Sequence, residues 1–122
     1  MRFARWVFTL AGIYGLVVVA PMYFAEAAMG EAGRPVSHPE LLYGFAGVTL
    51  AFQILFLIIG RDPARLRPAM IAAVVEKVSF PAAVWPLYMQ GRTPGAVAAF
   101  ATVDLLLAVL FAIAWLRTKP AA

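Results

Sequence analysis

Four apolar stretches, each long enough to cross a lipid bilayer, constrain this chain more than any other feature. They contain at most two charged side chains each and cover residues 6–25, 41–60, 68–90 and 94–116. A membrane-spanning helix needs about 20 mainly apolar residues. The sequence therefore predicts an all-α integral membrane protein, an antiparallel bundle of four transmembrane helices in a single membrane domain of residues 1–122. The predicted spans are about residues 5–27, 39–60, 68–89 and 94–116.

The composition excludes several classes of protein. Hydrophobic residues make up 64% of the chain and charged residues 13%, against about half and about a quarter in soluble domains. These values argue against a soluble enzyme, a nucleic-acid-binding domain and a disordered segment. The chain has no cysteine and a single histidine, His38, so thiolate sites and a three-histidine zinc site within one chain are excluded. We expect no metal, no cofactor and no nucleic-acid partner.

Residues typical of helix ends lie between the apolar stretches. Ser37 and Glu40 fit a capping box that opens the second helix. Thr93, directly before a proline, fits an N-cap of the fourth. Gly60 and Gly91 fit C-terminal caps. The connections are short, which favours antiparallel neighbours.

The basic residues predict the orientation of the bundle. Seven lie on one side of the spans, and they are Arg2, Arg5, Arg61, Arg65, Arg67, Arg117 and Lys119. Only Arg34 and Arg92 lie on the other side. Because lysine and arginine collect in cytoplasmic loops, we expect a multi-pass protein of a bacterial inner membrane with both termini in the cytoplasm. The basic loop 61–67 would contact anionic lipid headgroups.

The first span has an alternative interpretation. Arg2 and Arg5 precede an apolar run that ends in the residues A-E-A-A at 25–28, a pattern that also resembles a secretory signal. Cleavage there would leave three spans in the same orientation. The run is about 20 residues long, which favours a span.

Each predicted helix carries a polar side chain at a similar depth. Counted at about 1.5 Å of rise per residue from the nearest flanking arginine, the depths lie between about 12 and 20 Å. The residues of this predicted polar layer are Tyr14, Thr49, Gln53, Glu76, Lys77, Ser79 and Asp104. A charged side chain inside a span costs several kcal/mol unless it is paired or hydrated, so the layer is a candidate functional site.

The three charged members of the layer need partners. Glu76 and Lys77 are sequence neighbours, about 100° apart around a helix, and are poorly placed to pair. We therefore expect Lys77 to pair with Asp104 across the third and fourth helices. An apolar setting favours a protonated carboxyl group, so Glu76 is the candidate catalytic acid and Asp104 the orienting carboxylate. Alternatively, all three form an ion-pair network that only fixes helix register, or contact a partner subunit.

The third predicted helix contains two prolines, Pro81 and Pro86, which each remove a backbone hydrogen bond. A bend there would open space for a pocket. Trp85 and Tyr88 would line it or, alternatively, belong to an aromatic belt at the membrane surface. The expected ligand-binding residues are therefore Lys77, Gln53, Tyr14, Thr49, Ser79, Trp85 and Tyr88. A weaker alternative places a metal or a pH sensor at His38 with Glu26 and Glu40.

Four short spans, cytoplasmic termini and embedded acidic residues make the whole chain resemble, in its architecture, the small bacterial four-helix membrane proteins of the DoxX-like and EXPERA-like (sterol isomerase-like) type. The resemblance implies a bundle with a cavity for a hydrophobic molecule and acidic residues at its floor. Glu76 or Asp104 would then be the acid or base. The chain has fewer intramembrane His, Trp and Glu residues than a sterol isomerase-like site, which argues against isomerase chemistry.

Three functions fit these observations. The first is binding of a lipid or hydrophobic small molecule in a midplane pocket with a polar floor, with or without proton-transfer chemistry. The second is a small proton-coupled transporter or exporter. Small multidrug exporters have this length, but they carry an acidic residue within the first helix, where this chain has none before Glu26. The third is a non-enzymatic accessory subunit. A homo-oligomer or a partner membrane subunit fits all three.

Overall fold

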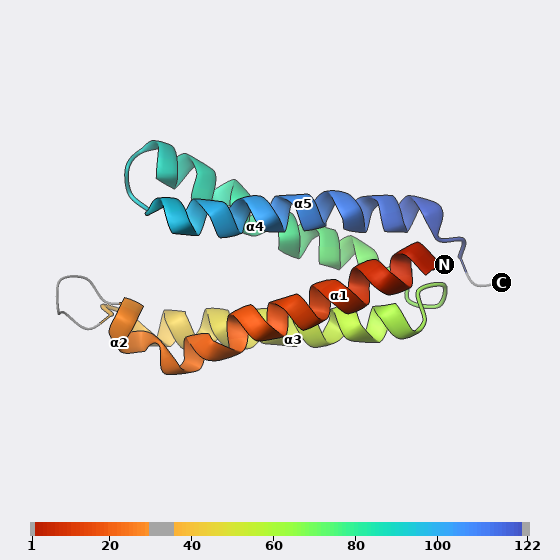
Figure 1. The fold of residues 1–122 in the computed structure, drawn as a ribbon, viewed down its shortest axis with the longest axis horizontal. Helices are drawn as coiled ribbons and strands as arrows, with labels where there is room; N and C mark the ends of the chain where they lie inside the picture. The colour runs from red at the N-terminus through yellow and green to blue at the C-terminus, as the bar shows by residue number, and fades with distance from the viewer. Residues whose placement is uncertain (1, 30–35, 121–122) are drawn as a thin grey trace.

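The computed structural model describes residues 2–29 and 36–120, and its regular elements are all helical (Figure 1). The elements are α1 (Arg2–Val19), the 3₁₀ segment η1 (Ala20–Phe24), α2 (Glu26–Met29), α3 (Pro39–Arg61), α4 (Ala69–Met89) and α5 (Gly95–Arg117). Four helices are long and apolar enough to cross a membrane: α1 with η1, α3, α4 and α5. The predicted all-α four-helix bundle is confirmed, and the composition and length of its helices are those of a multi-pass membrane protein.

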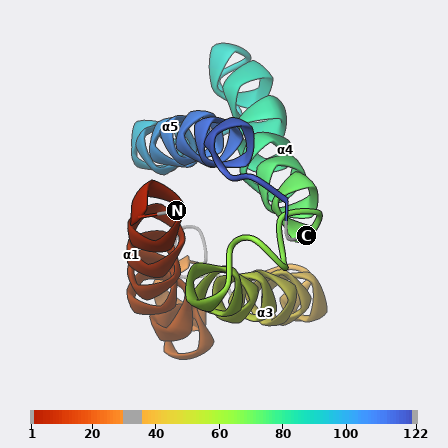
Figure 2. The ribbon, with the colours of Figure 1, turned by 90° about the vertical axis from the view of Figure 1, so that its right-hand side faces the viewer.

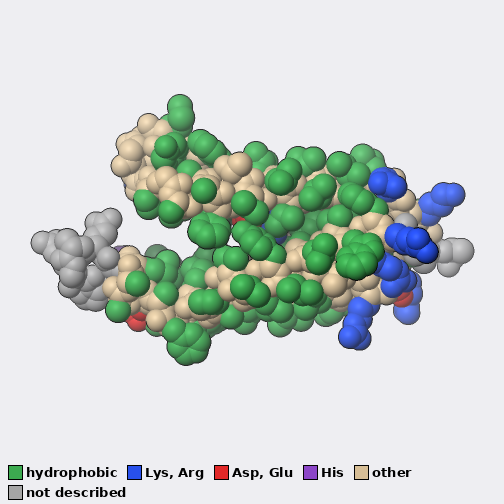
Figure 3. Space-filling view, viewed as in Figure 1, with side chains coloured by type: hydrophobic (Ala, Val, Ile, Leu, Met, Phe, Trp, Pro, Cys, Tyr) green, Lys and Arg blue, Asp and Glu red, His purple; other side chains and the backbone are tan. Residues whose placement is uncertain are grey.

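The bundle consists of two helical hairpins. α1 packs along α3, and α4 packs along α5, while contacts between the hairpins are fewer and run mainly between α1 and α5. The hairpins lie close together at the end that holds both termini and are further apart at the other end (Figures 1 and 2). We call the first the basic end, because most of the lysines and arginines gather there (Figure 3), and the second the distal end.

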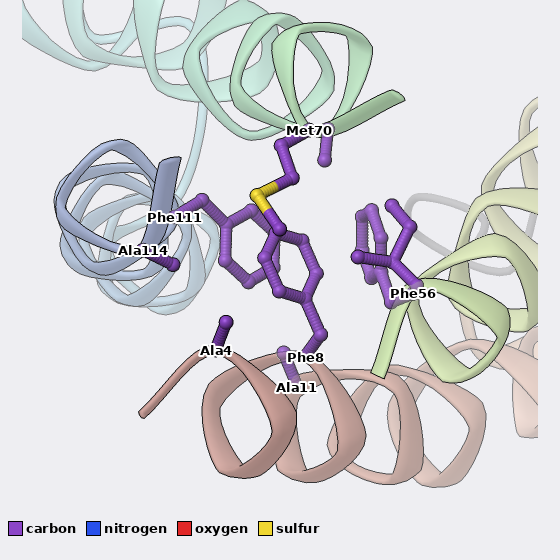
Figure 4. Packing of buried hydrophobic residues seen from close by; sticks show 9 residues of the cluster. Ala4, Phe8, Ala11, Phe56, Met70, Phe111 and Ala114 are labelled. Atoms are coloured by element: carbon purple, nitrogen blue, oxygen red, sulfur yellow. The ribbon is translucent and has the colours of Figure 1, made fainter. Parts of the chain in front are cut away.

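A cluster of aromatic rings fills the half of the bundle next to the basic end, here called the packed half. The rings of Phe8 and Phe111 stack with centroids 4.2 Å apart, and Phe56 meets Phe111 edge-on at 4.9 Å. Met70 reaches into the cluster from α4 (Figure 4). Because all four long helices contribute to it, this cluster joins the two hairpins.

Glycines allow α1 and α3 to approach closely. A Cβ atom on Gly12 would lie 2.8 Å from the side chain of Leu57, closer than packed carbon atoms come. One on Gly60 would lie 2.5 Å from the hydroxyl oxygen of Thr9. Gly60 lies within α3, whose C-cap is Asp62. The expectation that Gly60 caps the helix is therefore wrong, and its role is to let α1 pass.

The predicted N-terminal caps are also wrong. The N-cap of α3 is His38, not Ser37, and Glu40 contacts the His38 ring at 3.1 Å. A capping box needs the acidic residue three positions after the cap, and with the cap at His38 that spacing is lost. At α5 the N-cap is Pro94 with an extended ψ of 159°, so Thr93 lies one residue too early to cap the helix.

The C-terminal end of α4 has the predicted glycine cap. Gly91 has a φ of 72°, a left-handed conformation that glycine adopts without steric cost. The turn brings the Arg92 amide to the carbonyl of Leu87 at 2.8 Å and the Gly91 amide to that of Tyr88 at 2.9 Å. These are the carbonyls that a helix end would otherwise leave without partners.

At the basic end, arginines satisfy helix carbonyls instead. Arg5 donates from Nη1 to the carbonyl of Arg61, the last residue of α3, at 2.8 Å. Arg67 donates from Nε to the carbonyl of Trp115 near the end of α5, at 3.1 Å, and stacks over the Trp115 ring at 4.0 Å. A positive charge at a helix C-terminus also opposes the negative end of the helix dipole. The basic end is therefore held by side chains that link α1 to α3 and the connection between α3 and α4 to α5.

The first span lies about three residues earlier than predicted, from Arg2 to Phe24 instead of residues 5–27. It begins at Arg2 and changes from α-helix to 3₁₀-helix at Ala20. Pro21 has no N–H to give to the carbonyl four residues earlier, and a 3₁₀ segment commonly follows such a loss. The other three predicted spans match their helices to within one residue at each end.

Candidate functional site

A cavity of about 460 Å³ lies between the two hairpins in the half of the bundle next to the distal end, here called the cavity half. All four long helices, together with η1 and α2, contribute to its lining. The molecular surface is hollowed between the hairpins in this half (Figure 3). The cavity follows from the divergence of the hairpins, since the aromatic cluster that joins them is confined to the packed half.

The floor of the cavity consists of one polar residue from each long helix. These floor residues are Tyr14, Gln53, Lys77 and Asp104. Lys77 donates from Nζ to Asp104 Oδ1 at 3.3 Å, so the predicted pair between α4 and α5 is confirmed. Thr49, one turn of α3 nearer the distal end than Gln53, also lines the cavity. The structure thus brings five members of the predicted polar layer to one cavity.

Glu76 approaches the same lysine from outside the cavity. Its Oε2 lies 3.7 Å from Lys77 Nζ, although we expected these sequence neighbours to be poorly placed for pairing. The expectation is wrong because it considered only the directions of the Cβ atoms. The four methylene groups of a lysine let its ammonium group come back to a neighbouring residue on the same helix. Glu76 does not line the cavity.

Lys77 is therefore shared between two carboxyl groups. Its side chain is 4% exposed, against 15% for Glu76 and 20% for Asp104. The ammonium group also lies 5.4 Å from the centre of the Phe56 ring, at the top of the packed half. If all three groups are ionised, the cluster has two negative charges and one positive charge, and no other salt bridge of the described residues reaches it.

The amide of Gln53 is fixed in one orientation. Its Nε2 donates to the carbonyl of Thr49 at 2.9 Å, and only the nitrogen of an amide can donate. Its Oε1 must then face the other way, against Gly15 of α1, where a Cβ atom would collide with it. Gln53 is fully buried, and among the described residues Oε1 has no hydrogen-bond partner. An unpaired buried acceptor costs about 1–3 kcal/mol.

The walls of the cavity are apolar, and their residues were not predicted from the sequence. Phe45 and Phe80 bridge α3 and α4 with ring centroids 5.9 Å apart, and Phe100 faces the cavity from α5. Each lies one helical turn from a floor residue or Thr49: Phe45 four before Thr49, Phe80 three after Lys77, Phe100 four before Asp104. Residues at these spacings share a helix face, so the signal was in the sequence.

Three predicted ligand-binding residues lie outside the cavity. The Ser79 hydroxyl is on an exposed face of α4 and donates to the backbone carbonyl of Glu76 at 2.8 Å. Trp85 and Tyr88 pack edge-to-face at 5.6 Å on the surface of α4 and are 37% and 41% exposed. The expectation that these three line the pocket is not met, because Ser79 lies on an exposed face of α4, and Trp85 and Tyr88 lie in the last turns of the helix, beyond Lys77 and Phe80.

The prolines of α4 do not line the cavity. α4 runs without a break from Ala69 to Met89, through Pro81 and Pro86. Pro81 is buried, and one turn later Val84 packs in a small apolar cluster with Ala98 and Ala101 of α5. This face of α4 therefore holds the second hairpin together.

The polar residues at the distal end pair among themselves. Tyr43 donates to Glu26 Oε2 at 2.8 Å, and His38 contacts Glu40. Within residues 2–29 and 36–120, no group of three His, Cys, Asp or Glu side chains is arranged to hold a metal ion. Glu26 thus contacts a tyrosine rather than His38.

The arrangement combines a shaped apolar space with a few polar groups at one end. Pockets for small molecules commonly have volumes of about 300–1,000 Å³, mostly apolar walls and a small number of polar groups that fix the orientation of the ligand. Comparisons of the chain with models of protein families, with curated proteins and with solved structures found no match.

Proposed function

We propose that this protein binds a lipid or hydrophobic small molecule in the cavity between its two hairpins, with the molecule's polar group at the floor formed by Tyr14, Gln53, Lys77 and Asp104. The observation that carries the proposal is the coincidence of three features in one place. The cavity has a volume of about 460 Å³, its walls are apolar, and polar groups from four helices meet at one end of it.

The surroundings support a ligand that comes from the bilayer. The hollow between the hairpins is on the side of the bundle (Figure 3), and the helices around it are those that are apolar enough to cross a membrane. A molecule dissolved in the acyl chains would then enter sideways, without passing through water. In the architecture that the chain resembles, DoxX-like and EXPERA-like, a cavity of this kind would be expected.

The orientation is part of the proposal. The basic end would lie on the cytoplasmic side of a bacterial inner membrane, with both termini there, because lysine and arginine collect on that side. The cavity half would then belong to the outer part of the bilayer.

Any proton exchanged with the ligand would pass through Asp104. Of the two carboxyl groups expected to act in proton transfer, Asp104 lines the cavity, whereas Glu76 contacts Lys77 and does not line it. This reverses the roles that the sequence suggested, in which Glu76 was the acid. A proton-coupled transporter is the second candidate, supported by the second carboxyl group beside Lys77. Proton flux in proteoliposomes that depends on both carboxyl groups would favour it.

A matched pair of substitutions tests the binding proposal. Val18 lines the cavity, whereas its neighbour Val17 is 68% exposed on the outside of α1. Val18→Trp should fill the cavity and abolish binding, and Val17→Trp should leave binding unchanged. Native mass spectrometry of protein released from nanodiscs would report the bound mass, and analysis of the extracted lipids would identify it. A bound molecule retained equally by both variants would contradict the proposal.

A further inference from the structure

We infer that the ligand's head group is a hydrogen-bond donor, a hydroxyl or a protonated amine, and that the floor rejects carboxylates. This inference rests on the proposed binding function and specifies the chemical class of its ligand. It would make the protein a receptor for long-chain or polycyclic alcohols and amines rather than a carrier of fatty acids.

The first argument comes from the charges at the floor. Lys77 is the cation of the cluster, and it already lies 3.3 Å from Asp104 Oδ1 and 3.7 Å from Glu76 Oε2. A ligand carboxylate would be a third acid competing for one ammonium group in a region that little water reaches, where like charges repel strongly. A hydroxyl adds no charge, and an ammonium group would balance the second negative charge that the cluster has when both carboxyl groups are ionised.

The second argument comes from the acceptors at the floor. Gln53 Oε1 is an acceptor without a partner among the described residues, in a fully buried side chain that lines the cavity. Asp104 uses Oδ1 for Lys77, and a carboxylate has a second oxygen that can accept. Gly15, against which Gln53 Oε1 lies, also lines the cavity, so a donor at the floor has both this acceptor and Asp104 within the same lining. A ligand that can only accept would leave Oε1 unpaired.

The third argument concerns the body of the ligand. The polar groups lie at one end of the cavity, and beyond them the lining is apolar as far as Met22 and Met29 near the distal end. A molecule with one polar end and one compact apolar body fits this distribution. A phospholipid with a large charged head group would not fit at the buried end.

The test uses four compounds with the same apolar chain: dodecanol, dodecylamine, dodecanoate and dodecyl methyl ether. Each competes with a long-chain alcohol that carries a photoactivatable diazirine, on the full-length protein in nanodiscs of fixed lipid composition. Labelling of cavity peptides is measured by mass spectrometry. The alcohol and the amine should compete about tenfold more strongly than the ether and the carboxylate, the ratio expected for one hydrogen bond to a charged or buried group.

Two variants assign the preference to residues. Gln53→Met keeps the volume of the side chain and removes the acceptor. The alcohol should then compete only about as strongly as the ether, so the ratio of their competition strengths should fall toward one. Asp104→Asn frees Lys77 from one partner, so dodecanoate should gain and dodecylamine should lose affinity. The wild-type series is decisive even if a variant does not fold.

The outcomes separate this inference from the proposed function. Equal competition by all four compounds, or strongest competition by dodecanoate, would overturn the inference and leave the binding function standing. If the diazirine alcohol labels no cavity peptide and no compound competes, the binding function itself is wrong.

Discussion

The two halves of the bundle are built by the same four helices and pack in opposite ways. In the packed half, large side chains from all four helices meet, and Phe8, Phe56 and Phe111 are fully buried. In the cavity half, the two hairpins diverge, and the corresponding face of α5 shows a half-exposed Phe100. The charged floor lies at the boundary, with Lys77 above the Phe56 ring.

This difference shows which half of the bundle stabilises the association of the two hairpins. Inside a bilayer, apolar burial gives little driving force between helices, and association depends on close packing and polar contacts. The packed half provides both, through the ring cluster and the arginine contacts at the basic end. The cavity half contributes mainly contacts within each hairpin, such as Val84 with Ala98 and Ala101, which leaves the space between the hairpins available for a ligand.

The largest expected effect is the difference in stability loss between equivalent truncations in the two halves. Phe111→Ala removes a fully buried ring that contacts Phe8 and Phe56, and we expect it to lower the free energy of unfolding by about 3 kcal/mol. Phe100→Ala, on the same helix, removes a ring that is 50% exposed and should cost less than about 1 kcal/mol. Unfolding by denaturant in mixed micelles measures both. Equal losses would show that the halves are packed alike.

At the boundary between the halves, removal of the shared cation should cause the next largest loss in the free energy of unfolding. Lys77→Met leaves Glu76 and Asp104 without the ammonium group between them, and we expect a loss of about 2 to 3 kcal/mol, since breaking a buried ion pair leaves an uncompensated charge. Adding Asp104→Leu to this variant should recover part of the loss. If the two changes prove simply additive in the same unfolding assay, the pair does not interact energetically.

At the basic end, removal of an arginine contact should cause a smaller loss of stability. Arg67→Lys keeps the charge but loses the stacking on Trp115 and the bond from Nε to its carbonyl, and about 1 kcal/mol should be lost. Arg65→Lys is the matched control, because that side chain is 79% exposed in the same loop. The melting temperatures of the two variants should therefore differ, and coinciding values would contradict the proposed link between α5 and the loop.

At the distal end, we expect a substitution of Thr93 to have the smallest effect on the free energy of unfolding. Thr93 does not cap α5, and its hydroxyl has no hydrogen-bond partner within the part of the chain that the structure describes. Thr93→Val should therefore change the free energy of unfolding by less than about 0.5 kcal/mol, whereas loss of a true N-cap costs about 1 kcal/mol. A loss of that size would mean that Thr93 does cap the helix in the membrane.

The fold was predictable from the sequence because its signal is long and simple. An apolar stretch of about 20 residues has few alternatives to a membrane-spanning helix, and three of the four spans were predicted to within one residue at each end. The pairing of Lys77 with Asp104 was also predictable, because two charges at similar depths in apolar surroundings stabilise each other.

The details that failed depend on the position of a single residue or on helix packing. The capping box at Ser37 failed because the N-cap of α3 is His38, one residue after Ser37. Trp85 and Tyr88 were expected at the pocket by residue type, but they lie in the last turns of α4, and the residues of α4 that line the cavity are Lys77 and Phe80. The hairpins diverge and leave a cavity because of how segments far apart in the sequence pack against each other. The periodicity of residues along a single helix does not reveal this packing.

Phe56 belongs to both halves at once. Its ring packs edge-on against Phe111, and the ammonium group of Lys77 lies over the same ring. The position of the Lys77 ammonium group along the bundle therefore depends on Phe56, a side chain that does not line the cavity. A change in ligand preference could then arise from a substitution in the hydrophobic core, so the selectivity of this protein can evolve without any change in the residues that contact the ligand.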